Sequence, residues 1–146
     1  MFTVAPADCG LRCGGLARRG TTPPLQGMVE LVACRTYWSD EAIRGAIARD
    51  VKQIVILGAG YDTRALRLAT EGVTFFEVDR PQVQTQKKAS YETMQLATKK
   101  PEFVSVDFSR EKLSEKLQQA GYDSRQPTVF VMEGVTMYIP RWVWPR

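Results

Sequence analysis

The chain has 146 residues, of which 44% are hydrophobic and 25% charged, and its formal net charge is +4. This length is enough for one domain with a hydrophobic core but not for two. The composition is that of an ordinary globular protein, and no apolar run approaches the roughly 18 residues of a membrane span. Because the Lys and Arg residues are dispersed, the positive charge does not indicate a nucleic-acid partner. Lys87-Lys88 and Lys99-Lys100 are interpreted as solvated positions on one helix.

The cysteines and the absence of histidine limit the chemistry. Three cysteines, Cys9, Cys13 and Cys34, are an odd number, which argues against a disulfide framework. Cys9 and Cys13 could begin a metal site, but the chain has no histidine to complete one. We therefore expect no metal. The commonest general base is missing for the same reason.

Residues 1–27 are rich in Gly, Pro and Arg and show no apolar period, so we expect a loose N-terminal extension followed by one domain over residues 28–146. The extension has no apolar stretch of the kind found in secretory signals. Its basic residues leave organelle targeting open, and otherwise we expect the protein in the cytoplasm.

Two helical segments are expected next. Residues 26–38 should be partly helical, and a second helix, capped by Ser39 or Asp40, should run to about Arg49 with one apolar face. Arg35 lies between these segments, where it could reach an anionic ligand group.

The stretch from Gln53 to Thr63, QIVILGAGYDT, carries the strongest signal in the sequence. Its unbroken apolar run is typical of a strand buried on both faces of a sheet. Gly58 and Gly60 then allow the backbone to approach a ligand. Asp62 and Thr63 offer an N-cap for a helix to about residue 69. A strand, a glycine turn and a helix start together predict a nucleotide-type site, although a plain strand-to-helix turn has the same pattern.

Strands and helices alternate through the rest of the chain. Strands are predicted at 73–78, 102–106 and 128–132, with helices from about 81 and 109 between them. This alternation predicts an α/β fold with a parallel, doubly wound, Rossmann-like sheet. Its ligand crevice would lie at the carboxyl ends of the strands, where four chosen positions fall: Gly58, Asp79, Asp107 and Glu133. Each acidic residue could alternatively be a helix cap.

Thr63 occupies the position of the third glycine in a dinucleotide fingerprint. This weakens a dinucleotide interpretation. It suits a cofactor without a pyrophosphate, such as S-adenosylmethionine.

Five ordered motifs resemble the leucine carboxyl methyltransferase family of S-adenosylmethionine-dependent enzymes: RTYW, LGAGYDTR, FFEVDRP, VSVDF and MEGVTMYIP. The closer resemblance is to its bacterial-type branch of O-methyltransferases. It covers about residues 28–140 and implies a class I methyltransferase fold. Family members continue well past the last motif, so we hypothesise that this chain is C-terminally truncated, with about four parallel strands.

The resemblance implies roles for particular residues. Arg35 would grip the methionine carboxylate, and Gly58 and Gly60 would let the backbone approach the methionyl part. Asp79 would accept hydrogen bonds from the ribose hydroxyls.

At the other end of the ligand, Asp107 would bond the adenine amino group, with Phe108 beside the ring. Glu133 would lie near the methionine end, and Tyr138 could line the site. No catalytic residue is assigned.

The function expected is transfer of a methyl group from S-adenosyl-L-methionine to a carboxylate or hydroxyl of a small molecule or to a protein C-terminal carboxylate. A carboxylate is slightly favoured because it is ionised near neutral pH without a base. The alternatives are a non-catalytic S-adenosylmethionine-binding module and an NAD-linked oxidoreductase. No nucleic-acid or membrane partner is expected. The strand at 128–132 would be an open apolar edge able to pair with another strand.

Overall fold

The computed structural model describes residues 23–93 and 100–138, with side chains from residue 27 onward. The chain divides into two compact units, Met1–Trp38 and Ser39–Arg146. The predicted loose stretch falls outside the described residues as far as residue 22. Among the described residues, no helix is long and apolar enough to cross a membrane.

Helix α1 runs from Pro23 to Ala48. The prediction of two helices separated near Ser39 is therefore wrong. No Gly or Pro interrupts the chain there, and the Asp40 side chain bonds to Arg64 and Arg67. The helix also begins inside the stretch expected to be loose. Its first residue is a proline, which is tolerated in a first turn because that N–H has no helical partner.

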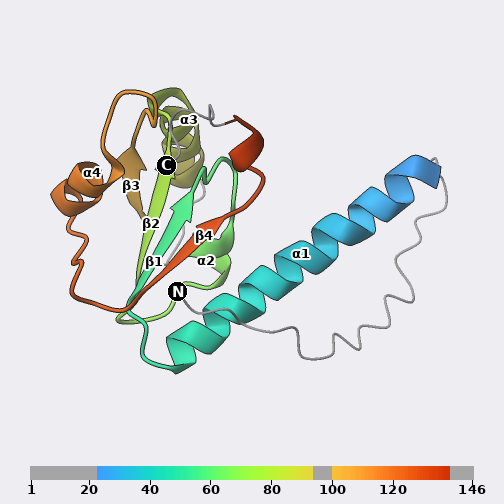
Figure 1. Cartoon of the computed structure of the whole chain (residues 1–146), viewed down its shortest axis with the longest axis horizontal. Coiled ribbons are helices and arrows are strands. Elements are labelled where there is room, and N and C mark those ends of the chain that lie inside the picture. Colours follow the sequence, from blue (N-terminus) through green and yellow to red (C-terminus); the bar gives the residue numbers. More distant parts are fainter. Residues whose placement is uncertain (1–22, 94–99, 139–146) are drawn as a thin grey trace, which may run out of the picture. The chain divides into compact units, whose positions relative to one another are not determined.

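The second unit is built on one parallel sheet in the order β3-β2-β1-β4 (Figure 1). The strands are β1 (Gln53–Leu57), β2 (Thr74–Asp79), β3 (Glu102–Ser105) and β4 (Thr128–Met132). All four predicted strands are confirmed, with bounds that differ by one residue at most. The three described connecting helices are α2 (Arg64–Arg67), α3 (Pro81–Thr93) and α4 (Leu113–Gln119), and a 3-10 turn, η1, covers Thr136–Tyr138.

Hydrophobic clusters cover both faces of the sheet. One contains Ile54, Ile56 and Phe75 from the strands, packed with Ile43 of α1 and Ala65 of α2. The other cluster contains strand residues whose side chains point to the opposite face, and Leu117 of α4 packs with them. These strand residues are Val55, Phe76, Val78 and Val104. Since side chains alternate between the two faces of a strand, the continuous apolar runs are explained by burial on both sides. The predicted doubly wound α/β class is confirmed.

The order in which strands are added to the sheet reverses between β1 and β4, although all the strands are parallel. The chain moves outward from β1 through β2 to β3, and then returns past β1 to form β4 on the opposite side. The carboxyl ends of β1 and β4 therefore flank the point at which open α/β sheets bind their ligands.

Strand β4 is an edge of the sheet within the described part of the chain. Its residues Phe130 and Met132 are 51% and 40% exposed. On the opposite face, Val129 and Val131 pack against the core. Pairing of this edge with another strand stays a prediction.

Candidate functional site

The loop of residues 58–63, called here the ligand loop, joins β1 to α2 and needs glycine at two positions. Gly58 and Gly60 have φ angles of +65° and +42°, which side-chain-bearing residues rarely adopt. A Cβ at Gly60 would meet only the carbonyl oxygen of Gly58, at 3.9 Å. A Cβ at Gly58 would lie 2.2 Å from Cγ2 of Val135. Gly60 is thus open to a ligand, whereas Gly58 makes room for Val135.

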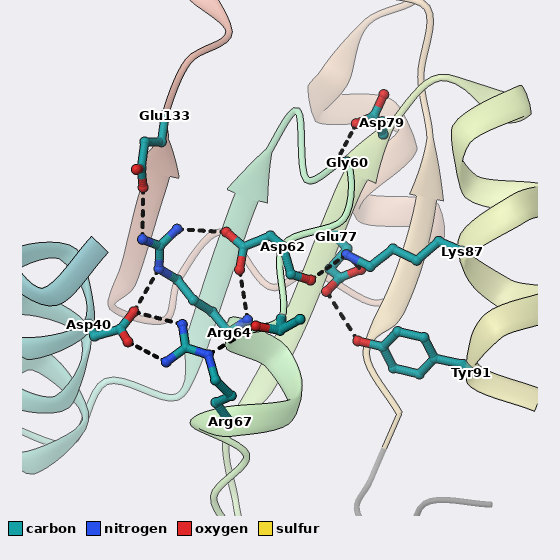
Figure 2. A network of polar contacts seen from close by, with 11 residues as sticks. Asp40, Gly60, Asp62, Arg64, Arg67, Glu77, Asp79, Lys87, Tyr91 and Glu133 are labelled. Carbon is teal, nitrogen blue, oxygen red and sulfur yellow. Dashed lines mark hydrogen bonds and ion pairs between the residues drawn. The ribbon is translucent and has the colours of Figure 1, made fainter. Parts of the chain in front are cut away.

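Asp79, at the end of β2, is held directly against the ligand loop. Its Oδ2 accepts a hydrogen bond of 2.7 Å from the Gly60 N–H (Figure 2). Its Oδ1 accepts one of 2.7 Å from the Arg80 N–H. Each carboxylate oxygen has two lone pairs, so both retain acceptor capacity. The structure therefore brings two predicted site residues, Gly60 and Asp79, together and orients the carboxylate.

Asp107 follows β3 and, like Asp79, lies at the carboxyl ends of the strands. The Val106 N–H donates to the Asp79 carbonyl oxygen at 2.9 Å, so the ends of β2 and β3 lie side by side. The Asp107 Oδ1 accepts bonds from the hydroxyl and the N–H of Ser109, which hold the pKa of Asp107 below its usual value. Phe108 packs against the core cluster that contains α4. An acceptor and an aromatic ring therefore stand next to each other beyond β3.

Glu133, directly after β4, pairs with an arginine from the first helical turn after the ligand loop. The guanidinium of Arg64 is 2.8 Å from Glu133 Oε2, 2.8 Å from Asp40 Oδ1 and 2.6 Å from Asp62 Oδ2. Arg64 is only 4% exposed. Arg67 also bonds to Asp40. We call Asp40, Asp62, Arg64, Arg67 and Glu133 the arginine cluster. It connects α1, the ligand loop, α2 and the end of β4 (Figure 2).

The two arginines of the cluster keep the Asp40 carboxylate charged. Burial alone would raise the pKa of Asp40, but the hydrogen bonds from Arg67 and Arg64 outweigh it and lower the pKa below its usual value. Burial likewise disfavours the Arg64 cation, but its hydrogen bond to Asp40 and the charge of Asp62 raise its pKa. The described residues contain no group of three or more His, Cys, Asp and Glu side chains able to hold a metal ion.

A second buried ion pair lies on the other side of the ligand loop. Lys87 of α3 is 4% exposed and Glu77 of β2 is fully buried, with 2.6 Å between Nζ and Oε2. The Lys87 Nζ also donates to the Asp62 carbonyl oxygen at 2.7 Å. Burial raises the pKa of Glu77 to about 7, against the opposing effect of Lys87. We call Glu77 and Lys87 the lysine pair. The interpretation of Lys87 as a solvated residue is wrong.

The roles implied for the candidate residues stay predictions. Glu133 reaches the ligand loop through Arg64, and Gly58 contacts Val135 in the same segment as Glu133. Arg35 lies on α1 in the unit that ends at Trp38, so its predicted role at the ligand is untested. Tyr138, in η1, is exposed.

Sequence reasoning missed both buried ion groups. Arg64 stands in the LGAGYDTR motif, and that was the available signal. Glu77 interrupts an apolar strand, which could have indicated a buried partner. Lys87 gave no such signal, because it is followed by Lys88 and two adjacent lysines are usually solvated.

The chain matches the family model described as leucine carboxyl methyltransferase over residues 12–142. The chain belongs to the leucine carboxyl methyltransferase family. The recognition of this family is thereby confirmed, and the match begins earlier than the resemblance, which covers about residues 28–140.

Relatives in mycobacteria carry the name "Putative S-adenosyl-L-methionine-dependent methyltransferase". One from Mycobacteroides abscessus is 38% identical over 128 residues, covering 86% of this chain and 41% of the relative. A second from the same species is 40% identical over 77% of this chain and 37% of its own length. One from Mycobacterium ulcerans is 36% identical over 76% of this chain and 37% of its own length. The chain thus spans about two fifths of the relatives it matches.

Proposed function

We propose that this chain binds S-adenosyl-L-methionine and belongs to an O-methyltransferase that methylates a carboxylate or hydroxyl group. The observation that carries the proposal is the contact between Asp79 and Gly60 at the carboxyl end of the sheet. It places an oriented carboxylate beside an open glycine at the carboxyl end of β1, the strand that borders the topological switch point. Family membership and the names of the relatives support the same cofactor.

The residues at this edge suit the parts of the cofactor. Asp79 retains lone pairs for a pair of ribose hydroxyls, and Gly60 leaves space for close approach of a ligand. Asp107 offers a carboxylate for an adenine amino group beside Phe108. Glu133 brings an acidic group to the end of β4 and is held there by Arg64.

When bound, the cofactor supplies an electrophilic methyl group on a sulfonium. The contribution of the chain is to orient it, because a displacement of this kind needs alignment, which can contribute several kcal/mol. No histidine is present to act as a base. For the residues of this chain, this slightly favours an acceptor that is already ionised, namely a carboxylate. The acceptor would be a small molecule or the C-terminal carboxylate of a protein, in the cytoplasm.

The acceptor class is tested by incubating the protein with cofactor carrying a radioactive methyl group and a panel of carboxylic acids, phenols and alcohols. A carboxylate acceptor gives a methyl ester, from which alkali releases labelled methanol. A hydroxyl acceptor gives an ether, which survives alkali. Binding without transfer to any acceptor would favour the non-catalytic alternative.

Asp79→Asn tests the cofactor role. The variant keeps the size of the side chain but loses the charge, so S-adenosylhomocysteine binding should weaken by about 1–3 kcal/mol through the lost charged hydrogen bonds. Calorimetric titration measures this change, with Asp50→Asn at an exposed turn as the matched control. Unchanged affinity in Asp79→Asn would contradict the ribose role.

A further inference from the structure

Helix α3 reaches the ligand loop through a side chain that the proposed chemistry does not use. The Lys87 ammonium is buried and has two partners on different elements, Glu77 on β2 and the Asp62 carbonyl oxygen. A buried ammonium is costly unless it is paired and hydrogen-bonded. Glu77 supplies the opposite charge and accepts one N–H of the Lys87 ammonium. The Asp62 carbonyl oxygen accepts a second of the three N–H groups of that ammonium.

Asp62 is held at every polar group that it possesses. Its N–H donates to the Ala59 carbonyl at 2.7 Å, and its carbonyl accepts from Lys87. Its Oδ1 accepts from the Arg64 N–H and its Oδ2 from the Arg64 guanidinium. Asp62 is therefore the point at which the arginine cluster and the lysine pair meet. Each of its polar groups therefore has a partner within the protein.

Gly60 lies two residues before this point, between two fixed positions. The Ala59 N–H donates to the Val78 carbonyl at 3.0 Å, which fixes the start of the loop to β2. The bond from Lys87 fixes its end. The Gly60 N–H that donates to Asp79 therefore lies between these two attachments.

We propose that Lys87 is a positioning residue that fixes the ligand loop through the Asp62 carbonyl oxygen. Its hydrogen bond, rather than its charge pairing with Glu77, is what the site requires. The effect on ligand affinity rests on the proposed function, whereas the effect on the loop does not.

The test compares two variants that both lack the Glu77 charge. Glu77→Gln keeps the Lys87 donor, whereas the double variant Glu77→Gln with Lys87→Met removes it and replaces it with an apolar chain of similar length. Lys88→Met, at the exposed neighbouring position, is the matched control. Each variant is measured by chemical unfolding, by calorimetric titration with S-adenosylhomocysteine and by hydrogen exchange of the peptide that covers the ligand loop.

Glu77→Gln and Lys88→Met should bind S-adenosylhomocysteine like the wild type and leave exchange of the loop unchanged. The double variant should remain folded, because a buried ion pair can be replaced by neutral groups at little cost. It should nevertheless bind about tenfold more weakly, as expected for one lost hydrogen bond to a charged group. Its loop amides should exchange faster than those of Glu77→Gln.

Equal affinity and equal loop exchange in Glu77→Gln and the double variant would overturn the proposal. If the double variant fails to fold, folded Glu77→Gln decides, since weakened binding or faster loop exchange there would make charge pairing the essential feature. If the wild type does not bind S-adenosylhomocysteine, the proposed function fails. Loop exchange still decides the role of Lys87 in that case.

Discussion

Two groups of buried charges lie beside the ligand loop, the arginine cluster and the lysine pair, and each offsets the cost of burying charge with a different cation. In the arginine cluster, one planar guanidinium meets three carboxylates, and the pKa of Asp40 lies below its usual value. In the lysine pair, one ammonium meets one carboxylate, and the pKa of Glu77 is raised to about 7. The comparison teaches that counting ion pairs does not predict protonation, because the number and direction of hydrogen bonds decide whether burial is offset.

The difference follows from the two cations. Arginine presents five donors in a rigid plane and can satisfy several carboxylates at once, whereas lysine is a point charge on a flexible stem. Lys87 also divides its donors between Glu77 and the Asp62 carbonyl. The Glu77 carboxylate therefore receives fewer charged hydrogen bonds to offset its burial, and its pKa is raised.

Arg64→Met should produce the largest effect. It leaves Asp40, Asp62 and Glu133 close together without the cation that neutralises them, and removal of one partner from a buried ion group costs about 3–5 kcal/mol. Urea unfolding of the variant measures the loss. A loss no greater than that of Arg67→Met would show that the arginine cluster is not an electrostatic unit.

The second prediction concerns pH. For Glu77 the folded-state pKa of about 7 lies above the usual value of 4.5, so the folded state binds the proton more tightly than the unfolded state. This contribution to stability is present at low pH and is lost as pH rises from about 4.5 to about 7. The loss is on the order of 3 kcal/mol.

Glu77→Gln cannot titrate, so the stability of the wild type relative to this variant should fall between pH 5 and pH 8. Unfolding of both proteins by urea across this range makes the comparison. A relative stability that rises with pH would mean that Lys87 more than offsets burial, and that the two ion groups behave alike.

Arg67→Met should have the smallest effect. Its side chain is 41% exposed and bonds only to Asp40 within the cluster, while Arg64 continues to neutralise that carboxylate. Solvent screening limits such a pair to about 0–1 kcal/mol. Thermal unfolding of Arg67→Met beside the wild type measures it. A loss comparable to that of Arg64→Met would erase the distinction between the two arginines.

The fold could be predicted because its signals are local. Continuous apolar runs predicted β1 and β4, and Gly60 and Asp79 were chosen from their positions after strands. The family follows from motifs of a few residues each. These features depend on short segments whose patterns survive in one sequence.

The buried ion groups could not be predicted because their partners come from separate elements. Arg64 lies after β1 and Glu133 after β4, so their contact depends on the strand order. The same is true of Lys87, whose burial depends on how α3 packs on β2 beside the ligand loop. The continuity of α1 at Asp40 was missed for a similar reason, since the side chain that resembled a cap serves a distant arginine.

Calorimetric titration of the 146-residue chain with S-adenosylhomocysteine, repeated with NAD, tests the central claim most directly. The account predicts saturable, micromolar binding of S-adenosylhomocysteine and much weaker binding of NAD, because the ligand loop has Thr63 where a dinucleotide fingerprint has its third glycine. A chain that is folded by circular dichroism and binds NAD more tightly, or that binds neither ligand, would contradict it.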